Sequence, residues 1–402
     1  MNNEEQGGLS GRRRVVVTGM GMVTPLGLSV EETWAALLRM ECGIGPIRRF
    51  DPSGFPVTFA AEVALRGEGA ELKRELTTWA LREAVAGLGA AGLPSGPRVG
   101  VCLGSEAARP PLSWMSEPPE AHPSLLADLA PDAPTRQVAE AVGAEGPRST
   151  VSTACTSSSQ AIGEAMLRIR RGEVDVMVAG GVDVLSEPLM VIGFSRLGAL
   201  STRNHDPEHA SRPFDRDRDG FVLGEGAGIL ILEEEEHARA RGAPILAELA
   251  GYGCSCNAWR ITDSPPDGRG PAQAMFAALA DAGLAPEAIG YINAHGTSTQ
   301  QNDLSESRAI ATVFGPNTVP VSSTKGHIGH LVAACGAVEA IFCVLALRDG
   351  LLPAGRNLDN VDPECPINPI RGEPLARPIR YALTNAFGFG GSNGSLILGS
   401  LQ

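Results

Sequence analysis

Aromatic residues are scarce in this chain of 402 residues, at 4%, whereas glycine occurs 49 times. A core with so few large rings must be filled by small aliphatic side chains, as in α/β proteins where helices pack closely on sheets. Apolar residues make up 43% of the chain and charged residues 20%, which excludes a wholly disordered protein. The length predicts two domains or one duplicated architecture.

Positive charge is also in short supply. The 33 lysine and arginine residues face 46 aspartate and glutamate residues, so the formal net charge is −13. This balance excludes a general nucleic-acid binder, which needs a basic face. It still permits a local basic patch that would attract an acidic partner.

The chain lacks a long uninterrupted apolar run and closely paired cysteines. The longest apolar stretch, 331–347, contains Glu339, so it predicts a buried helix and no membrane span. The N-terminal residues MNNEEQGGLSGRRR have no apolar segment of the kind found in a secretory signal. The eight cysteines show no CxxC spacing, and Cys254 and Cys256 form only an isolated CxC. These features predict a reduced, cytoplasmic protein.

Strand-like and helix-like segments alternate along the chain, which predicts a layered α/β fold. The expected strands include 13–21, 97–105, 174–184 and 289–294, and the expected helices include 30–40 and 75–92. The proline-rich segment 108–134 predicts a long loop over a site or an interface, and the charged segment 204–220 predicts a second loop.

Two segments resemble each other and suggest an internal duplication. Residues 149–175 and 319–350 each run from a short strand through a small-residue turn into a long apolar helix. Cys155 and Lys325 fall at similar points of the two segments. A duplication would bring two helix N-termini together at a shared crevice.

Cys155, in VSTACTSSSQ, stands between a strand and a helix. At a helix N-terminus the backbone N–H groups favour a thiolate, so Cys155 is a candidate nucleophile. The alternative is a small buried filler, which is the usual role of a cysteine.

Histidines and a lysine stand at the ends of two later strands. His295, in NAHGTST, follows a buried strand and is a candidate for proton or hydrogen-bond chemistry, with Asp303 and Glu306 positioned to orient neighbours. The segment SSTKGHIGH holds Lys325, His327 and His330. The i,i+3 spacing of the last two could suggest a metal site, but no further ligands complete a zinc set. His205 and His209 lie in a charged loop, where a solvated face is the simpler reading.

Two further features need an explanation. The segment NAFGFGGSNG, 385–394, lacks the lysine of a phosphate loop, so we expect its glycines to let backbone N–H groups approach a reacting oxygen. Glu339 lies in an apolar helix and must find a cation, a hydrogen-bond donor or a metal ion.

Taken together and in order, TACTS, NAHGTST, SSTKGHIGH and NAFGFGGSNG resemble the decarboxylating β-ketoacyl-acyl-carrier-protein synthases of the synthase I/II class. The resemblance covers nearly the whole chain. It implies a thiolase-type five-layered αβαβα fold of two pseudo-repeated halves. We divide these halves at 1–244, carrying the nucleophile, and 245–402, carrying the histidine and lysine motifs. It also implies a homodimer.

The resemblance implies a role for each matching residue. Cys155 would be the acylated nucleophile, His295 and His330 the decarboxylation pair, and Lys325 and Glu306 the remaining catalytic-site residues. The backbone N–H groups of Cys155 and Phe389 would form an oxyanion hole. The residues implied to bind substrate are Thr297, Thr299, Phe387 and Phe389; those implied to hold a structural monovalent cation are Asn293, Ala294, Glu339 and Asn385. Lys73 and Arg74 are candidate contacts for a carrier protein.

The implied reaction is decarboxylative Claisen condensation between a malonyl-carrier-protein thioester and an acyl group on Cys155, in fatty-acid elongation, with no redox cofactor. The segment 105–150 is shorter than the family pattern, and Ser157–Gln160 replace a more usual run, so the acyl pocket is expected to differ. Three alternatives stay open. One is a ketosynthase of a polyketide, polyene or unusual-lipid pathway. Another is a non-catalytic partner subunit like a chain-length factor. The third, a thiolase acting on coenzyme A, lacks its second cysteine in GFGGSNG.

Overall fold

Five strands of the first half form one side of a large central sheet. The structure, a computed structural model, describes residues 12–110, 112 and 123–401. The strands of the first half are β1 (Val15–Val23), β4 (Val99–Gly104), β5 (Arg148–Val151), β6 (Val176–Asp183) and β7 (Gly226–Glu234). The strands of the second half are β8 (Ala247–Cys256), β9 (Ile289–Asn293), β10 (Pro320–Ser322), β12 (Asn368–Pro369), β14 (Tyr381–Phe387) and β15 (Ser392–Gly399).

The two halves repeat one topology. Strands in the first half are ordered β1-β7-β6-β4-β5, and those in the second β8-β15-β14-β9-β10, with β12 added at the edge. In each half the first three strands pair antiparallel and the last three pair parallel. A short register between β1 and β8 joins the halves. The predicted pseudo-repeat is therefore confirmed.

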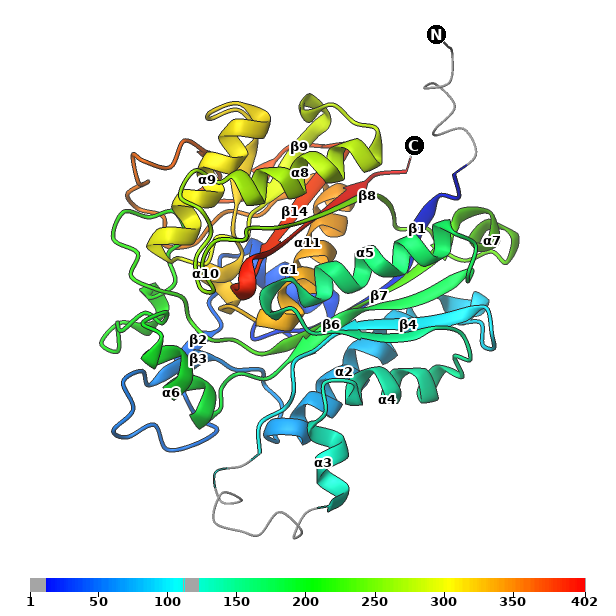
Figure 1. The fold of residues 1–402 in the computed structure, drawn as a ribbon, viewed down its shortest axis with the longest axis horizontal. Helices are drawn as coiled ribbons and strands as arrows, with labels where there is room; N and C mark the ends of the chain where they lie inside the picture. The colour runs from blue at the N-terminus through cyan, green and yellow to red at the C-terminus, as the bar shows by residue number, and fades with distance from the viewer. Residues whose placement is uncertain (1–11, 111, 113–122, 402) are drawn as a thin grey trace.

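Helices complete the five layers that the family resemblance implies. Helices α2 (Gly69–Ala86) and α4 (Ala133–Val142) cover the outer face of the first half, and α8 (Arg269–Ala282) and α9 (Gln300–Phe314) flank the second. Between the halves lie α5 (Ser157–Arg170) and α11 (Cys335–Asp349), which pack on each other and on strands of both halves. Figure 1 shows this succession from α8 and α9 at the top to α2 and α4 below.

The middle layer is built from apolar and very small side chains. Residues 335–346 of α11 are all buried, which confirms the buried helix predicted for the longest apolar stretch. A Cβ atom on Gly336 would lie 2.0 Å from Ser159 Oγ and 2.9 Å from the backbone nitrogen of Ser159. Glycine at this position therefore lets α5 and α11 touch along their backbones.

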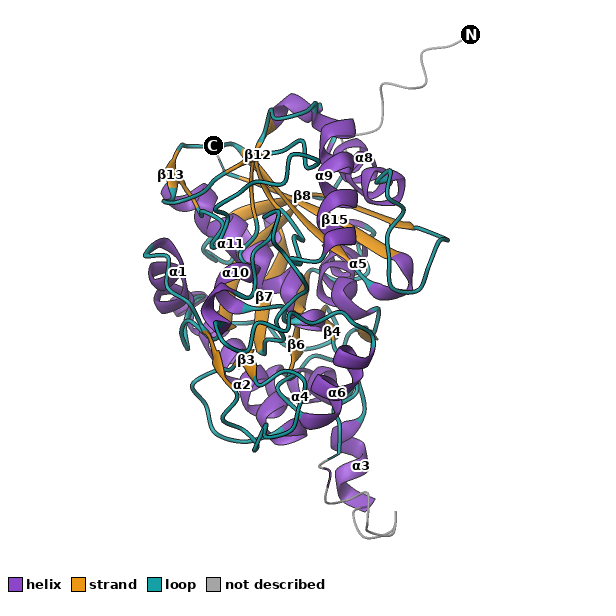
Figure 2. Cartoon of the chain, turned by 90° about the vertical axis from the view of Figure 1, so that its left-hand side faces the viewer, coloured by secondary structure: helices purple, strands orange, loops and turns teal. Residues whose placement is uncertain are grey.

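The remaining helices lie around this frame. They are α1 (Val30–Leu38), α3 (Pro123–Leu129), α6 (Pro188–Arg196), α7 (Glu235–Ala240) and α10 (Lys325–Ile328). Short strand pairs form between β2 (Ile44–Pro46) and β3 (Phe59–Ala61), and between β11 (Leu351–Leu352) and β13 (Leu375–Ala376). Figure 2 shows α1 on the side of the molecule near α10 and α11, where Trp34 stacks on Phe342 at 6.3 Å between ring centroids.

Two expectations about loops need revision or comment. The segment 108–134 is not one long loop, because α3 lies inside it and α4 begins at its end; residues 111 and 113–122 lie outside the described residues. The segment 204–220 is irregular, as predicted, but it buries an Arg212–Asp215 ion pair. Across the described ranges, none of the helices has the length and apolar composition needed to cross a membrane.

Candidate active site

Cys155 lies in a strained turn between β5 and α5. The turn is a short 3-10 helix, in which the preceding residue, Ala154, has a φ of +53°. A non-glycine residue in this left-handed region costs about 1 kcal/mol or more. The Ser157 hydroxyl braces the turn, since it accepts the Thr153 N–H at 2.9 Å and donates to the Ala154 carbonyl oxygen at 2.7 Å.

The second half repeats this turn before α11. Val332 has a φ of +41° at the position that matches Ala154. The two helix N-termini meet, as the duplication predicts, because Cys335 Sγ lies 3.2 Å from the Cys155 carbonyl oxygen. The structural repeat pairs Cys155 with Ala333, the second residue of the matching turn, and so differs from the pairing with Lys325 that the sequence suggested.

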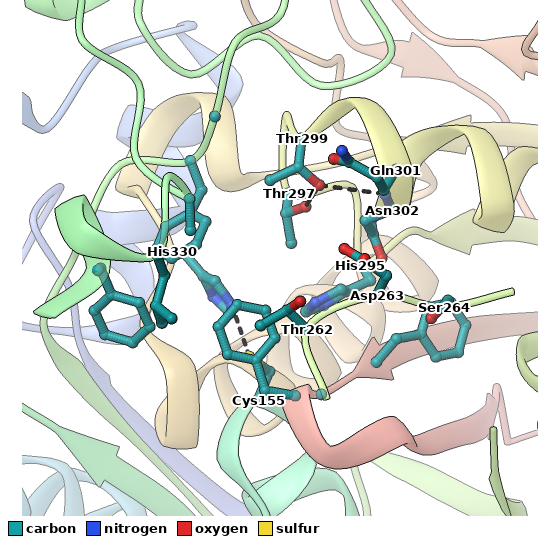
Figure 3. Close-up of a pocket in the computed structure, with 18 of the residues that line it drawn as sticks. Cys155, Thr262, Asp263, Ser264, His295, Thr297, Thr299, Gln301, Asn302 and His330 are labelled. Carbon is teal, nitrogen blue, oxygen red and sulfur yellow. Dashed lines mark hydrogen bonds between the residues drawn. The ribbon is translucent and has the colours of Figure 1, made fainter. Parts of the chain in front are cut away.

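Two histidines face the Cys155 thiol (Figure 3). His330 Nε2 lies 3.0 Å from Cys155 Sγ, and the His295 and His330 rings are 5.2 Å apart at 80°. The Val332 N–H donates to His330 Nδ1 at 3.3 Å. Because Nδ1 accepts a hydrogen bond, the proton of neutral His330 sits on Nε2, which points at Cys155 Sγ.

Both histidines are held in the neutral form. Burial lowers the pKa of His295 and His330 well below the ordinary value, and the nearby positive charge of Lys325 lowers it further. The two rings can therefore donate N–H bonds to a developing oxyanion without carrying a charge of their own.

The thiol of Cys155 is protonated in the resting protein. Burial raises its pKa to about 12, against the opposing effects of Lys325 and of hydrogen bonds from the Phe389 and Cys155 backbone N–H groups. The helix N-terminus led us to expect a lowered pKa, and this expectation is wrong because burial outweighs the favourable dipoles. The thiolate is therefore a minor form, which the Phe389 and Cys155 N–H groups and the charge of Lys325 stabilise.

Lys325 answers the question raised by Glu339. The two side chains form an ion pair between Nζ and Oε1, and each is 1% exposed. Burial lowers the pKa of Lys325, but the charge of Glu339, its hydrogen bond and the charges of Cys335 and Glu306 together raise the pKa above the ordinary value, so the ammonium persists. Lys325 thus places a fixed positive charge next to both histidines and the thiol.

Glu306 lies behind His295. Its carboxylate accepts the N–H groups of His295 at 2.8 Å and Gly296 at 2.7 Å, and also the Asn385 amide at 3.2 Å. It is fully buried and is not among the residues that line the pocket. Glu306 therefore orients the turn that carries His295, and it does not touch the substrate space.

The pocket above these groups has a volume of about 270 Å³. Its floor holds Cys155, His295 and His330, and the substrate-binding residues predicted from the sequence all line it: Thr297, Thr299, Phe387 and Phe389. The hydroxyls of Thr297 and Thr299 lie 3.0 Å apart, on the side opposite Cys155 in Figure 3.

Gly388 lets the loop after β14 approach Cys155 closely. A Cβ atom at this position would lie 2.9 Å from the Thr153 carbonyl oxygen and 3.4 Å from the Cys155 nitrogen. Without a side chain here, the next N–H group, that of Phe389, reaches Cys155 Sγ. This is the close approach that the glycine-rich segment predicted.

Several predicted sites have other roles. Lys73 is 3% exposed, donates to the Glu106 carbonyl oxygen and pairs with Asp183 at 3.2 Å, so its proposed surface contact with a carrier protein is wrong. Arg74 is exposed and pairs with Asp128 at 2.5 Å.

His327 does not face a metal ligand. Its ring nitrogens lie 2.9 Å and 3.0 Å from the carbonyl oxygens of Glu41 and Ala354, which anchor it as a structural residue. His205 and His209 are exposed, in agreement with a solvated loop.

The run Ser157–Gln160 does not line the pocket. Ser158 Oγ accepts the Ala337 N–H at 3.0 Å, and Gln160 links the Thr153 hydroxyl at 3.0 Å to Ser392 at 2.6 Å. These side chains connect the turn that carries Cys155 to α11 and to the glycine-rich segment 385–394. Their expected effect on the acyl pocket is therefore indirect.

The sequence reasoning missed Glu106, which holds the turn that carries Cys155. Glu106 lies two residues after the end of β4, and its carboxylate contacts the turn that carries Cys155 at Ala154, Ser152 and Ser157. A signal existed, because β4 and β5 are parallel neighbours whose carboxyl ends meet at one edge.

The chain matches known proteins over most of its length. Residues 12–238 match the family described as Beta-ketoacyl synthase, N-terminal domain, and residues 246–359 match Beta-ketoacyl synthase, C-terminal domain. The chain is 39% identical to 3-oxoacyl-[acyl-carrier-protein] synthase 2 of Synechocystis sp. over 97% of this chain and 99% of the relative. It is 41% identical to the protein of the same name from Coxiella burnetii, over 96% and 98% of the two chains.

Solved structures agree. A type II polyketide synthase acyl-carrier protein in complex with its ketosynthase includes a chain that superposes with a TM-score of 0.90, at 33% identity, over 97% of this chain and 100% of that chain. A β-ketoacyl synthase from Burkholderia phymatum superposes with a TM-score of 0.89, at 37% identity, over the same shares.

Proposed function

The chain belongs to the β-ketoacyl synthase family, and from this membership we propose how its own residues divide the work of condensation. The protein is a β-ketoacyl-acyl-carrier-protein synthase, which joins an acyl group to a malonyl-derived unit in fatty-acid elongation. The observation that carries the residue assignment is the cluster of Cys155, His295 and His330 on the pocket floor. The Cys155 sulfur and one ring nitrogen of each histidine all lie within 4.8 Å of one another.

In the first step, we assign the acyl transfer to Cys155. The Cys155 thiol gives up its proton, the thiolate attacks the acyl-carrier thioester, and a C–S bond forms to Cys155. The bond from the acyl carbon to the carrier sulfur breaks, and the carrier leaves as a thiolate that takes up the proton. The Phe389 and Cys155 N–H groups hold the oxyanion of the tetrahedral intermediate; a donor in this role is worth about 3–4 kcal/mol in other enzymes. Lys325 supports the thiolate through its positive charge.

In the second step, we assign decarboxylation to the two histidines. The bond from the malonyl carbon to its carboxylate breaks, CO₂ leaves, and the electron pair moves into an enolate. His330 Nε2–H and the neutral His295 ring donate to the enolate oxygen. The enolate carbon attacks the acyl carbonyl on Cys155, and the C–S bond to Cys155 breaks.

The arm of the carrier protein would enter along the pocket wall. Thr297 and Thr299 offer two hydroxyls to its amide groups, and Phe387 and Phe389 stand where a loop could open or close over the acyl group. The conserved chemistry of such an arm, amides on a flexible chain, fits hydroxyl donors spaced along a channel.

The cation set implied by the family resemblance fits in part. In the described part of the chain, Asn293 Oδ1 and Glu339 Oε2 are buried oxygens without a hydrogen-bond partner, as a hard monovalent cation requires. Asn385 is engaged by Glu306 and by Ser395 at 2.7 Å, so its side chain is occupied. We propose that Asn293, Ala294 and Glu339 would hold the ion, whose contribution there is a balancing charge.

We also propose a homodimer, a carrier-protein partner and a cytoplasmic location. The strand order ends at β5, a half-exposed edge that a second copy can extend by strand pairing. All eight cysteines are free, which fits a reducing compartment. Sedimentation velocity of the purified protein checks the dimer, and a monomer at micromolar concentration would contradict it.

The residue assignment is tested by two substitutions at Cys155. Cys155→Ala should abolish acyl transfer and condensation, because no nucleophile remains. Cys155→Gln should abolish condensation yet keep malonyl decarboxylation, because the histidines are intact. Mass spectrometry of the intact protein follows loading by acyl carriers of several chain lengths, and CO₂ release follows decarboxylation. Condensation by Cys155→Ala at the unsubstituted rate would overturn the assignment.

A second candidate keeps the reaction and changes the pathway, to a polyketide, polyene or unusual-lipid ketosynthase. The observation that raises it is the TM-score of 0.90 to a chain from the polyketide ketosynthase complex, although the identity of 33% is lower than the 39% and 41% to the 3-oxoacyl-[acyl-carrier-protein] synthases. Loading of Cys155 by saturated acyl carriers of increasing length supports fatty-acid elongation, whereas loading only by polyketide or polyene carriers supports the second candidate.

A further inference from the structure

The carboxylate of Glu106 forms hydrogen bonds with the strained turn that carries Cys155. Glu106 Oε1 accepts the backbone N–H of Ala154 at 2.9 Å and lies 3.2 Å from the Ser157 hydroxyl, and Oε2 accepts the Ser152 hydroxyl at 2.7 Å. Groups on each side of the turn and one in its backbone therefore contact a single carboxylate, with Ala154 and Ser152 as its donors.

The bond to Ala154 matters because Ala154 is the strained residue of the turn. Its φ of +53° is unfavourable for a residue with a Cβ atom and persists only when surrounding contacts hold it. The Ala154 N–H cannot serve a regular helix or sheet ladder in this conformation, so Glu106 satisfies it with a charge-assisted hydrogen bond. The next residue along the chain is the nucleophile.

Glu106 is itself fixed in place. Its backbone carbonyl oxygen accepts a hydrogen bond from the buried Lys73 Nζ at 2.7 Å, and Lys73 pairs with Asp183 at the end of β6. Glu106 is half-buried and is not one of the pocket-lining residues. It therefore acts on the reaction through Cys155 and not through the substrate.

We propose that Glu106 is a positioning residue, which holds the strained Ala154–Cys155 turn and thereby keeps Cys155 Sγ and the Cys155 N–H in place for acyl transfer. The negative charge of Glu106, which is hydrogen-bonded to the residue before Cys155, also disfavours the thiolate form of Cys155. This inference rests on the proposed role of Cys155. The charge effect agrees with the electrostatics, since Glu106 raises the pKa of Cys155 whereas Lys325 lowers it. The other titratable groups that face the thiol are His295, His330 and Cys335.

Two substitutions separate the positioning role from the charge. Glu106→Gln keeps an oxygen that accepts the Ala154 N–H and removes the negative charge. Glu106→Ala removes both. Glu62→Gln is the matched control, because Glu62 is also half-buried and accepts two backbone N–H groups, at Arg48 and Arg49, but does not touch the nucleophile turn.

The readouts are alkylation of Cys155 by iodoacetamide at fixed pH, located by mass spectrometry, and kcat for condensation. Glu106→Gln should alkylate several-fold faster than the unsubstituted protein, because more thiolate is present, with kcat within about threefold. Glu106→Ala should also alkylate faster, but its kcat should fall at least about tenfold, the effect of losing one charge-assisted hydrogen bond. Glu62→Gln should match the unsubstituted protein in both.

Equal alkylation rates in Glu106→Gln and the unsubstituted protein would overturn the charge effect. An undiminished kcat in Glu106→Ala would overturn the positioning role, and thermal melting shows that each variant is folded. Failure of the proposed function looks different: the unsubstituted protein itself would then not become acylated at Cys155.

Discussion

At the scale of single residues, the side chains to which we assign the chemistry line the pocket, whereas those that position them are buried behind it. Cys155, His295 and His330 meet on the pocket floor, whereas Lys325 and Glu306 act from behind. The tautomer of His330 is set by a backbone N–H from a strained residue, Val332. Strain thus stands beside the nucleophile and beside a proton donor, which is typical of functional sites.

The two histidines should be separable from the thiol. His295→Ala and His330→Ala should each lower malonyl decarboxylation by about a hundredfold or more, the usual effect of removing an oxyanion donor. Cys155 should still be acylated by an acyl carrier in both variants, as measured by mass spectrometry. Unchanged decarboxylation in either variant would contradict the assignment.

The same histidines predict the pH dependence of decarboxylation. Because burial and Lys325 lower both pKa values well below the ordinary one, the rings stay neutral as the solution is acidified. The decarboxylation rate of Cys155→Gln should therefore stay constant between about pH 8 and about pH 6. In contrast, a histidine with an unperturbed pKa would be half protonated near pH 6.5, and the rate would fall there. CO₂ release across this range measures it, and a midpoint near pH 6.5 would show that the rings are not shielded.

At the scale of elements, α5 and α11 set the geometry of the site because their N-termini carry the nucleophile and the turn after His330. Their backbones touch at Gly336, where an added Cβ would collide with both the side chain and the backbone of Ser159. The helix pair, and with it the distance between Cys155 and His330, depends on this close approach.

Gly336→Ala should destabilise the protein by about 1–3 kcal/mol, the usual effect of overpacking, although alanine is the better helix former. Gly193→Ala in α6 is the matched control, because nothing lies within 4 Å of its added Cβ. There the helix propensity alone acts, and the variant should gain up to about 1 kcal/mol. Urea unfolding measures both, and a Gly336→Ala variant as stable as Gly193→Ala would show that α5 can move aside.

Much of the element order could be predicted, because periodicity marks strands and helices locally. The buried helix at 331–347 and the glycine-rich approach to Cys155 followed from residue patterns alone. Contacts between distant segments could not be predicted in this way. The sequence suggested that Lys73 is a surface charge, but in the fold it is buried and pairs with Asp183. Glu106 is distant in sequence from the turn whose N–H group it accepts.

The pKa of Cys155 illustrates the same limit. Sequence showed a cysteine at the start of a helix, which alone predicts a lowered pKa. The opposite shift arises because residues from both halves close over the thiol, leaving it 6% exposed. Burial is a property of the tertiary structure, so no local pattern around VSTACTSSSQ contains it.

At the scale of the whole molecule, the two halves share one middle layer. Helix α11 of the second half packs on β7 and β6 of the first, and α5 of the first packs on β15 and β8 of the second. The division at 244/245, which falls between α7 and β8, separates two topological repeats. Each repeat has an outer hydrophobic cluster of its own, and both share a larger central cluster. The active site needs both, since Cys155 comes from one half and His295 and His330 from the other.

This shared layer predicts a single cooperative unfolding transition. If either half unfolded alone, the buried apolar faces of α5 and α11 would be exposed to water. This exposure costs about 25 cal/mol of free energy per Å² of apolar surface, so neither half should stay folded without the other. Urea unfolding followed by far-ultraviolet circular dichroism and by tryptophan fluorescence should give coincident curves, at a fixed protein concentration because a dimer would add a concentration dependence. The fluorescence reports on both halves, since Trp34 of the first half stacks on Phe342 of α11, whereas Trp259 of the second half is half-exposed. Two separated transitions, or a soluble and folded fragment 245–402, would show that the halves are independent domains.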